Sequence, residues 1–210
     1  MDSQTFILLS AVIAYLGAFA SLYISLSLFK LGDFIKDKGL TLSAIAMTIF
    51  GISLLIEATV NIMAPTYISG PGRKPQELLT ILVNRGTLIA IPLYTISYVL
   101  MASSHYVSGV SIKETAIPLK EFSIIPLFVL MFIDYNIIDL IVLIVAAAIV
   151  LGKYGSARLP TVIFYIILGI SHLIPVMLLF ASSSWWIVPL STLLRGLAPL
   201  ILFASSLIRG

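Results

Sequence analysis

The sequence predicts an all-α polytopic membrane protein with seven transmembrane helices, and three observations support this fold class. Of the residues, 60% are hydrophobic and only 10% are charged, and the mean hydropathy is +1.15. Such a composition is typical of integral membrane proteins. Apolar runs of about 20 residues, the length of a helix that spans a bilayer, recur along the chain. Short segments that carry most of the lysines and arginines separate these runs.

Five runs can be placed directly as spans. The first is too long for the apolar core of a cleavable signal and has no basic segment before it, so we expect it to be retained. The five expected spans are Thr5–Leu31, Leu40–Met63, Leu78–Ala102, Thr161–Ala181 and Ile187–Ile208.

The run from Ile117 to Gly152 predicts either one long helix or two shorter spans that meet near Asp134. Lysine and arginine separate these alternatives, because they accumulate in cytoplasmic loops. With six spans and an outside N-terminus, five basic residues fall on each side of the membrane. With seven spans, eight fall inside and two, Arg73 and Lys74, fall outside. The charges therefore favour seven spans, with the N-terminus outside and the C-terminus inside.

An internal repeat favours the same number of spans. The segments FGISLLIEA, Phe50 to Ala58, and LGISHLIPV, Leu168 to Val176, share a GIS-x-LI core, and each precedes a span with an Arg-Gly pair. Two three-helix units are parallel only if one further span links them. We therefore expect a 3+1+3 parallel tandem repeat. Its parts are a first three-helix unit over 1–104, an amphipathic connector and linking helix over 105–134, and a second three-helix unit over 135–210.

This 3+1+3 plan is similar to that of the SWEET sugar uniporters and the PnuC-type vitamin transporters, and its seven spans resemble those of microbial rhodopsins. The resemblance is one of architecture. A rhodopsin requires a lysine in its last span to hold retinal, and Ile187–Ile208 contains none. SWEET halves carry a proline within their first helices, and neither Thr5–Leu31 nor Ile137–Leu151 has one. No functional residue is therefore carried over from these families.

Ionisable residues inside the apolar runs form the candidate site, because a charge in hydrocarbon is costly unless it is paired or hydrated. Glu57 and Arg85 are expected at similar depth in an antiparallel hairpin, where a bidentate pair would satisfy both. That pair is either a structural clamp or part of a solute site. For Arg195 we expect a pair with Asp139. The alternative is an unpaired Arg195 that binds an anionic group.

His172 lies near the middle of its span, where a lone histidine is expected to hydrogen-bond between helices, and a proton relay is the alternative role. His105 lies at a different depth, so we expect no haem held by the two histidines. Cysteine is absent, which excludes disulfides and thiolate metal sites. We therefore expect neither a cofactor nor a metal. Asparagine and glutamine are also scarce, as in many thermophilic proteins.

The sequence favours a small transporter or channel-like carrier for an anionic or polar solute, with its polar site in the outer half of the bundle. The alternative is a non-catalytic membrane subunit of a larger respiratory or secretion complex. No constellation typical of intramembrane proteolysis or prenyl transfer is present, so we expect no enzyme. Nucleic acid is not an expected partner. The expected partners are the lipid bilayer of the cell membrane and either a second copy or other membrane subunits.

Overall fold

The computed structural model describes residues 3–68, 75–107, 135–176 and 186–209, and all regular secondary structure within them is helical. Five of the helices are long and apolar enough to cross a membrane, which makes the chain a multi-pass membrane protein. The described elements are α1 (Ser3–Ile35), α2 (Lys38–Ile68), α3 (Pro75–Val107), α6 (Tyr135–Tyr154), the 3-10 turn η1 (Gly155–Arg158), α7 (Leu159–Val176) and α8 (Ile187–Arg209).

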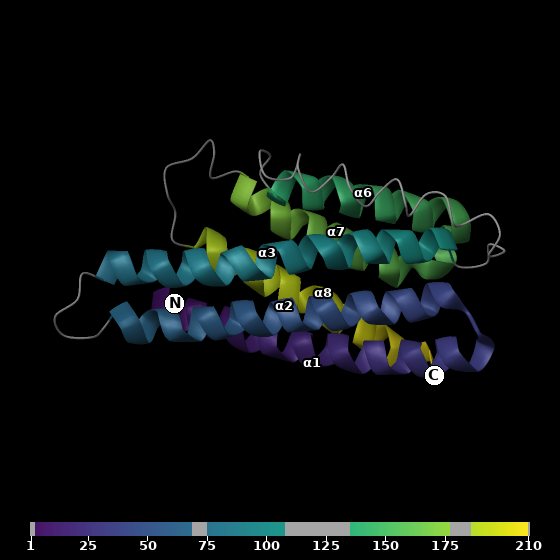
Figure 1. The fold of residues 1–210 in the computed structure, drawn as a ribbon, viewed down its shortest axis with the longest axis horizontal. Coiled ribbons are helices and arrows are strands. Elements are labelled where there is room, and N and C mark those ends of the chain that lie inside the picture. Colours follow the sequence, from purple (N-terminus) through teal and green to yellow (C-terminus); the bar gives the residue numbers. More distant parts are fainter. Residues whose placement is uncertain (1–2, 69–74, 108–134, 177–185, 210) are drawn as a thin grey trace.

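The six described α-helices lie side by side along the long axis of the molecule (Figure 1). Each packs against the next in the order α1, α2, α3, α6, α7 and α8, and α8 returns to pack against α1. Helices α1, α3, α6 and α8 begin at the end where Figure 1 marks the N-terminus, which we call the N end. Helices α2 and α7 begin at the opposite end, which we call the C end. The described helices therefore form a closed ring.

Helices α3 and α6 run in the same direction. Thr95 of α3 donates a hydrogen bond to Asp139 of α6. Further along both helices, Lys153 of α6 donates to the backbone carbonyl of His105 of α3. The last residue of α3 and the first residue of α6 therefore lie at opposite ends of the bundle. The expected linking helix falls in residues 108–134, which lie outside the described residues.

The connection between α1 and α2 is a short capped turn. Lys36 adopts a left-handed conformation, with φ of 56°, and the next amide, of Asp37, donates to the carbonyl of Gly32 at 3.0 Å. This is the Schellman pattern that ends many helices. The carboxylate of Asp37 then accepts the amide of Gly39 at 2.7 Å, which caps the start of α2. The turn therefore holds the two helices as an antiparallel hairpin.

Helices α1 and α8 approach each other at two glycines. A Cβ atom added to Gly196 would lie 2.7 Å from the carbonyl oxygen of Ile13 and 2.8 Å from the Cα of Ala14. Gly17 faces the backbone of Gly196 in the same way. Only residues without a side chain allow such an approach, which is a common way for membrane helices to pack. Since Gly196 lies against α1, the preceding residue, Arg195, is directed toward α2.

The centre of the bundle is filled by four buried aromatic rings, which we call the aromatic layer: Phe50, Tyr94, Tyr98 and Phe164. The ring of Phe50 lies 5.5 Å from Tyr94, 5.9 Å from Tyr98 and 6.1 Å from Phe164. Tyr94 and Tyr98 are stacked at 6.0 Å. These distances are typical of favourable aromatic contacts. The aromatic layer joins α2, α3 and α7 midway along the helix bundle.

The expected spans agree with the described helices. All five spans placed directly from the sequence fall on helices, although α7 ends at Val176 and residues 177–185 lie outside the described residues. The described part of the ambiguous run is helical and forms α6, from Tyr135 to Tyr154. Helices α3 and α8 continue through Pro92 and Pro199. The seventh span, the repeat with its three parts and the orientation in the membrane stay predictions.

Candidate functional site

Polar side chains from five helices meet at the aromatic layer and between it and the N end. On α2 and α8 they are spaced three or four residues apart, which places them on one face of each helix. All are buried or half-buried. They are Glu57 and Asn61 of α2, Tyr94, Thr95 and Tyr98 of α3, Asn136 and Asp139 of α6, His172 of α7, and Ser191, Thr192 and Arg195 of α8.

The first group is centred on an ion pair between Glu57 and Arg195. Nη2 of Arg195 lies 3.3 Å from Oε1 of Glu57, and the two side chains are 9% and 13% exposed, respectively. Thr192 donates its hydroxyl to Oε1 at 2.6 Å, and Tyr94 donates its hydroxyl to Oε2 at 2.6 Å. Both oxygens of the carboxylate therefore have a donor. Such saturation is what keeps a buried ion pair tolerable in a low dielectric.

The guanidinium of Arg195 makes further contacts besides the ion pair. Nη2 donates to the hydroxyl of Ser191 one turn earlier in α8. The guanidinium carbon lies 5.2 Å from the centre of the Tyr94 ring, within the range of a cation–π contact. Asn61 extends the group by donating to Thr192 at 3.1 Å. Tyr94 thus supports the pair twice, through its hydroxyl on the carboxylate and its ring under the cation.

The second group is centred on His172. Nδ1 lies 3.1 Å from the amide oxygen of Asn136 and 3.7 Å from Oδ2 of Asp139, and Nε2 lies 3.0 Å from the hydroxyl of Tyr98. Because a carboxylate and an amide oxygen only accept hydrogen bonds, the geometry assigns the proton of the neutral ring to Nδ1. Nε2 then accepts from Tyr98. Thr95 donates to the other oxygen of Asp139 at 2.7 Å.

The structure corrects the expected partner of Arg195. The pair with Asp139 is wrong, and so is the alternative of an unpaired Arg195, because Arg195 contacts Glu57 instead. Asp139 lies against His172 and Thr95. The physical reason is the glycine contact between α8 and α1, which turns Arg195 so that its guanidinium reaches Glu57 of α2. The expected pair of Glu57 with Arg85 cannot be compared, since the side chain of Arg85 lies outside the described residues.

The expectation for His172 as a hydrogen-bonding residue between helices is confirmed, since it joins α7 to Tyr98 of α3 and Asn136 of α6. The proton-relay role stays a prediction. His105 contacts a different residue, Tyr165, at 2.6 Å, near the C end. Within the described part of the chain, no three histidine, aspartate or glutamate side chains are grouped as a metal site would require.

A cavity of about 160 Å³ lies beside the ion pair, and we call it the N-end cavity. This volume is below the range of roughly 300–1,000 Å³ found for pockets that take drug-sized ligands, so any occupant is small. Its polar lining comes from Glu57, Asn61, Tyr94, Asn136, Ser191 and Arg195. Val60, Ile91 and Val188 contribute apolar surface. Both charges of the buried pair therefore face an open space.

The sequence alone did not identify Tyr94 and Thr192, which donate to Glu57, or Tyr98, which contacts His172. Tyr94 and Tyr98 are uncharged and lie in an apolar run, where aromatic residues are ordinary. Thr192 offers a weak signal, because it lies three residues before Arg195 and so on the same face of a helix. Comparison with known proteins found no match among family models, curated proteins or solved structures.

Proposed function

We propose that the protein is a small membrane carrier whose solute site is the N-end cavity. The observation that carries this proposal is that both members of a buried ion pair line the cavity, together with the amides of Asn61 and Asn136. A pair that serves only stability gains nothing from an adjoining space. A polar solute in that space would find a cation, an anion and uncharged donors and acceptors within reach.

The solute is a small anionic or zwitterionic molecule. Its anionic group would bind Arg195, whose planar guanidinium suits a carboxylate or phosphate. Glu57 competes for the same guanidinium, at 3.3 Å, and would be displaced or would bind a cationic group of the same solute. Tyr94 would keep its ring under the guanidinium during this exchange. Exchange of one counter-ion for another avoids an unpaired buried charge at any step.

The aromatic layer would be the closed barrier of the carrier. It lies between the N-end cavity, which Tyr94 lines, and a second pocket nearer the C end, which Phe164 lines. A carrier that exposes its site alternately to the two sides needs such a barrier near the middle of the membrane. His172 contacts Tyr98 in the layer and Asp139 beside it, which suits a proton relay coupled to opening.

The tandem 3+1+3 plan belongs to the same proposal. Each packing contact within α1, α2 and α3 has a counterpart within α6, α7 and α8, and the parallel contact of α3 with α6 corresponds to that of α8 with α1. Because α3 ends at the C end and α6 begins at the N end, a crossing by the intervening residues would complete seven spans. The charge distribution would favour an orientation with the N end outside the cell membrane.

One observation favours the alternative function, a non-catalytic subunit of a larger membrane complex. Each oxygen of Glu57 already accepts from a residue of this chain, and Arg195 is paired. A non-catalytic subunit would be expected to have its buried charges paired within the chain, as Glu57 and Arg195 are. Native mass spectrometry of the protein extracted from its host membrane in mild detergent separates the two functions. A monomer or homo-oligomer that carries a small molecule supports the carrier, and a stoichiometric foreign subunit supports the alternative.

A matched pair of variants links that measurement to the site. Ile91→Phe would fill part of the N-end cavity without touching a charge. Ile96→Phe makes the same change at a position on α3 that is 48% exposed. We expect Ile91→Phe to lose the bound small molecule and Ile96→Phe to keep it. Equal retention by both variants would show that the molecule binds elsewhere and would remove the support for this cavity as the solute site.

A further inference from the structure

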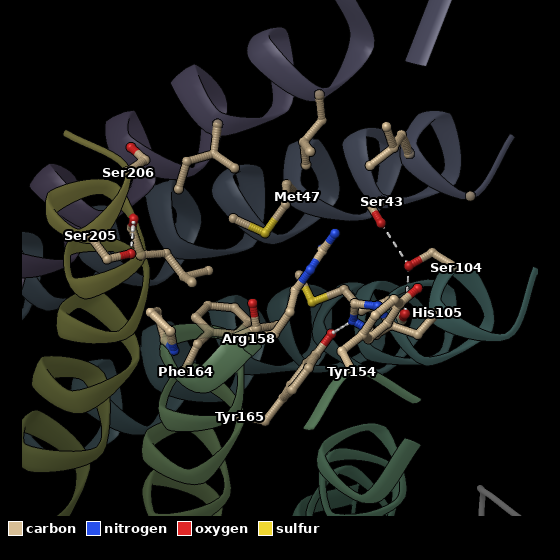
Figure 2. A pocket seen from close by; sticks show the side chains of 18 residues that line it. Ser43, Met47, Ser104, His105, Tyr154, Arg158, Phe164, Tyr165, Ser205 and Ser206 are labelled. Atoms are coloured by element: carbon tan, nitrogen blue, oxygen red, sulfur yellow. Dashed lines mark hydrogen bonds between the residues drawn. The ribbon is translucent and has the colours of Figure 1, made fainter. Parts of the chain in front are cut away.

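A second pocket, of about 300 Å³, opens near the C end, and we call it the C-end pocket. It lies between α1, α2, α3, α7 and α8, on the other side of the aromatic layer from the N-end cavity. Met47, Met101, Phe164 and Leu202 give it an apolar interior. Its polar lining includes Ser43, Ser104, His105, Arg158, Ser205 and Ser206 (Figure 2). The pocket therefore combines an apolar interior with polar groups.

Arg158 is the charged residue among the described lining residues, and none of them is an acid. Figure 2 shows its side chain projecting into the pocket toward Met47. Its guanidinium lies 4.8 Å from the centre of the Tyr154 ring, which holds it from one side. Among the described residues, none makes a hydrogen bond or an ion pair with Arg158, and no aspartate or glutamate lines the pocket.

Within the described ranges, the two acids near this end of the bundle contact other groups. Asp33 pairs with Lys36 at 2.8 Å on the exposed surface. Asp37 accepts the amides of Gly39 and Leu40 and so caps α2. The described basic residues near the same end outnumber these two acids, and they are Lys30, Lys36, Lys38, Lys153 and Arg158. The described charges near the pocket are therefore mostly positive.

Two further features suit an anion in this pocket. Lys153 lies at its edge, where Nζ donates to the backbone carbonyl of His105 and lies 5.5 Å from the Tyr154 ring. The first turn of α7 contributes Pro160 and Thr161 to the lining. The start of a helix carries a partial positive charge that favours phosphate. Because Arg158 directly precedes α7, the guanidinium and this helix start act on the same space.

We propose that the C-end pocket binds a phosphate-headed ligand, with the phosphate on Arg158 and an attached apolar chain over Met47, Met101 and Phe164. The forked guanidinium can hold two phosphate oxygens at once. Arg158 lies one residue before the apolar span that begins at Leu159, which is the depth of lipid head groups. The ligand is either an anionic phospholipid or a free phosphate compound. This site is independent of the proposed solute site.

Thermal unfolding of the full chain in neutral detergent tests this inference. The probes are phosphatidylglycerol, with phosphatidylcholine as its uncharged counterpart, and inorganic phosphate, with chloride at equal ionic strength. The variants are Arg158→Gln and Lys30→Gln. Lys30 is an exposed cation near the same end but outside the pocket, so its substitution removes the same charge. Arg158→Lys, which keeps the charge but not the fork, is a third variant.

We expect at least one probe to raise the unfolding temperature of the wild type and of Lys30→Gln. The apparent affinity of Arg158→Gln for that probe should be at least tenfold weaker than that of the wild type. Arg158→Lys should lie between them. A shift with phosphatidylglycerol alone identifies a lipid head group, and a shift with inorganic phosphate identifies a free phosphate ligand. The proposal is overturned if neither probe gives a shift that depends on Arg158, or if Lys30→Gln loses as much as Arg158→Gln.

Discussion

Replacement of Arg195 by glutamine tests whether the ion pair with Glu57 holds the bundle together. In Arg195→Gln, Glu57 keeps the hydroxyls of Tyr94 and Thr192 but loses the cation at 3.3 Å. Removal of one partner of a buried pair costs about 3–5 kcal/mol, because the other charge stays buried. Glu57 is 13% exposed and borders a cavity, so we expect the lower end, about 3 kcal/mol.

The double variant Glu57→Gln/Arg195→Gln makes the test specific. Two amides leave no buried charge, so the double variant should be no less stable than either single variant. The coupling free energy between the two positions is then at least about 3 kcal/mol in magnitude, at the top of the usual range for residues in contact. Unfolding in mixed micelles with increasing sodium dodecyl sulfate, followed by circular dichroism, gives the free energy of unfolding for each protein.

Lys30→Gln is the control, since it removes an exposed cation and should change the free energy of unfolding by less than about 0.5 kcal/mol. The reasoning is refuted if Arg195→Gln is as stable as this control. It is also refuted if the losses from the two single variants simply add in the double variant, because the charges would then act independently.

Two further predictions use the same unfolding assay. Gly196→Ala would place a methyl group 2.7 Å from a backbone carbonyl of α1, and we expect it to cost at least about 2 kcal/mol. Gly152→Ala, where an added Cβ has no neighbour within 4 Å, should be neutral or slightly stabilising, and equal effects of the two changes would contradict the described contact. Tyr94→Phe removes one donor from the buried carboxylate of Glu57 and should cost about 1–3 kcal/mol. Tyr23→Phe, at a residue 57% exposed, should cost almost nothing, and a larger loss there than at Tyr94 would refute the assignment.

The spans could be predicted from the sequence because a membrane helix is a local property. A run of about 20 apolar residues is enough to place it, whatever packs beside it. Thr5–Leu31 and Ile187–Ile208 therefore fall within α1 and α8 with only small differences at their ends. Helix α1 continues beyond its apolar run to Ile35, and the Schellman hydrogen bond of the capped turn ends it there.

The partner of Arg195 could not be predicted in the same way. Depth in the membrane follows from position along a span, and both Glu57 and Asp139 were expected in the same half of the bundle as Arg195. Which of these two acids pairs with Arg195 depends on the rotation of α8 about its own axis. That direction is set by the contact of Gly196 with α1, a residue pair far apart in the sequence. Charge and depth together therefore identify the members of the site but leave their pairing open.

The contact of Gly17 with Gly196 also bears on how the ring could open. Backbones that touch at two glycines leave no side chains between them to rearrange, so α1 and α8 should turn as one rigid body. The other parallel contact, between α3 and α6, is made by side-chain hydrogen bonds such as that of Thr95 with Asp139. As the helices part, hydrogen bonds of this kind can be exchanged for bonds to water or to a solute. We expect α1 and α8 to stay together and the ring to separate between α3 and α6, next to His172.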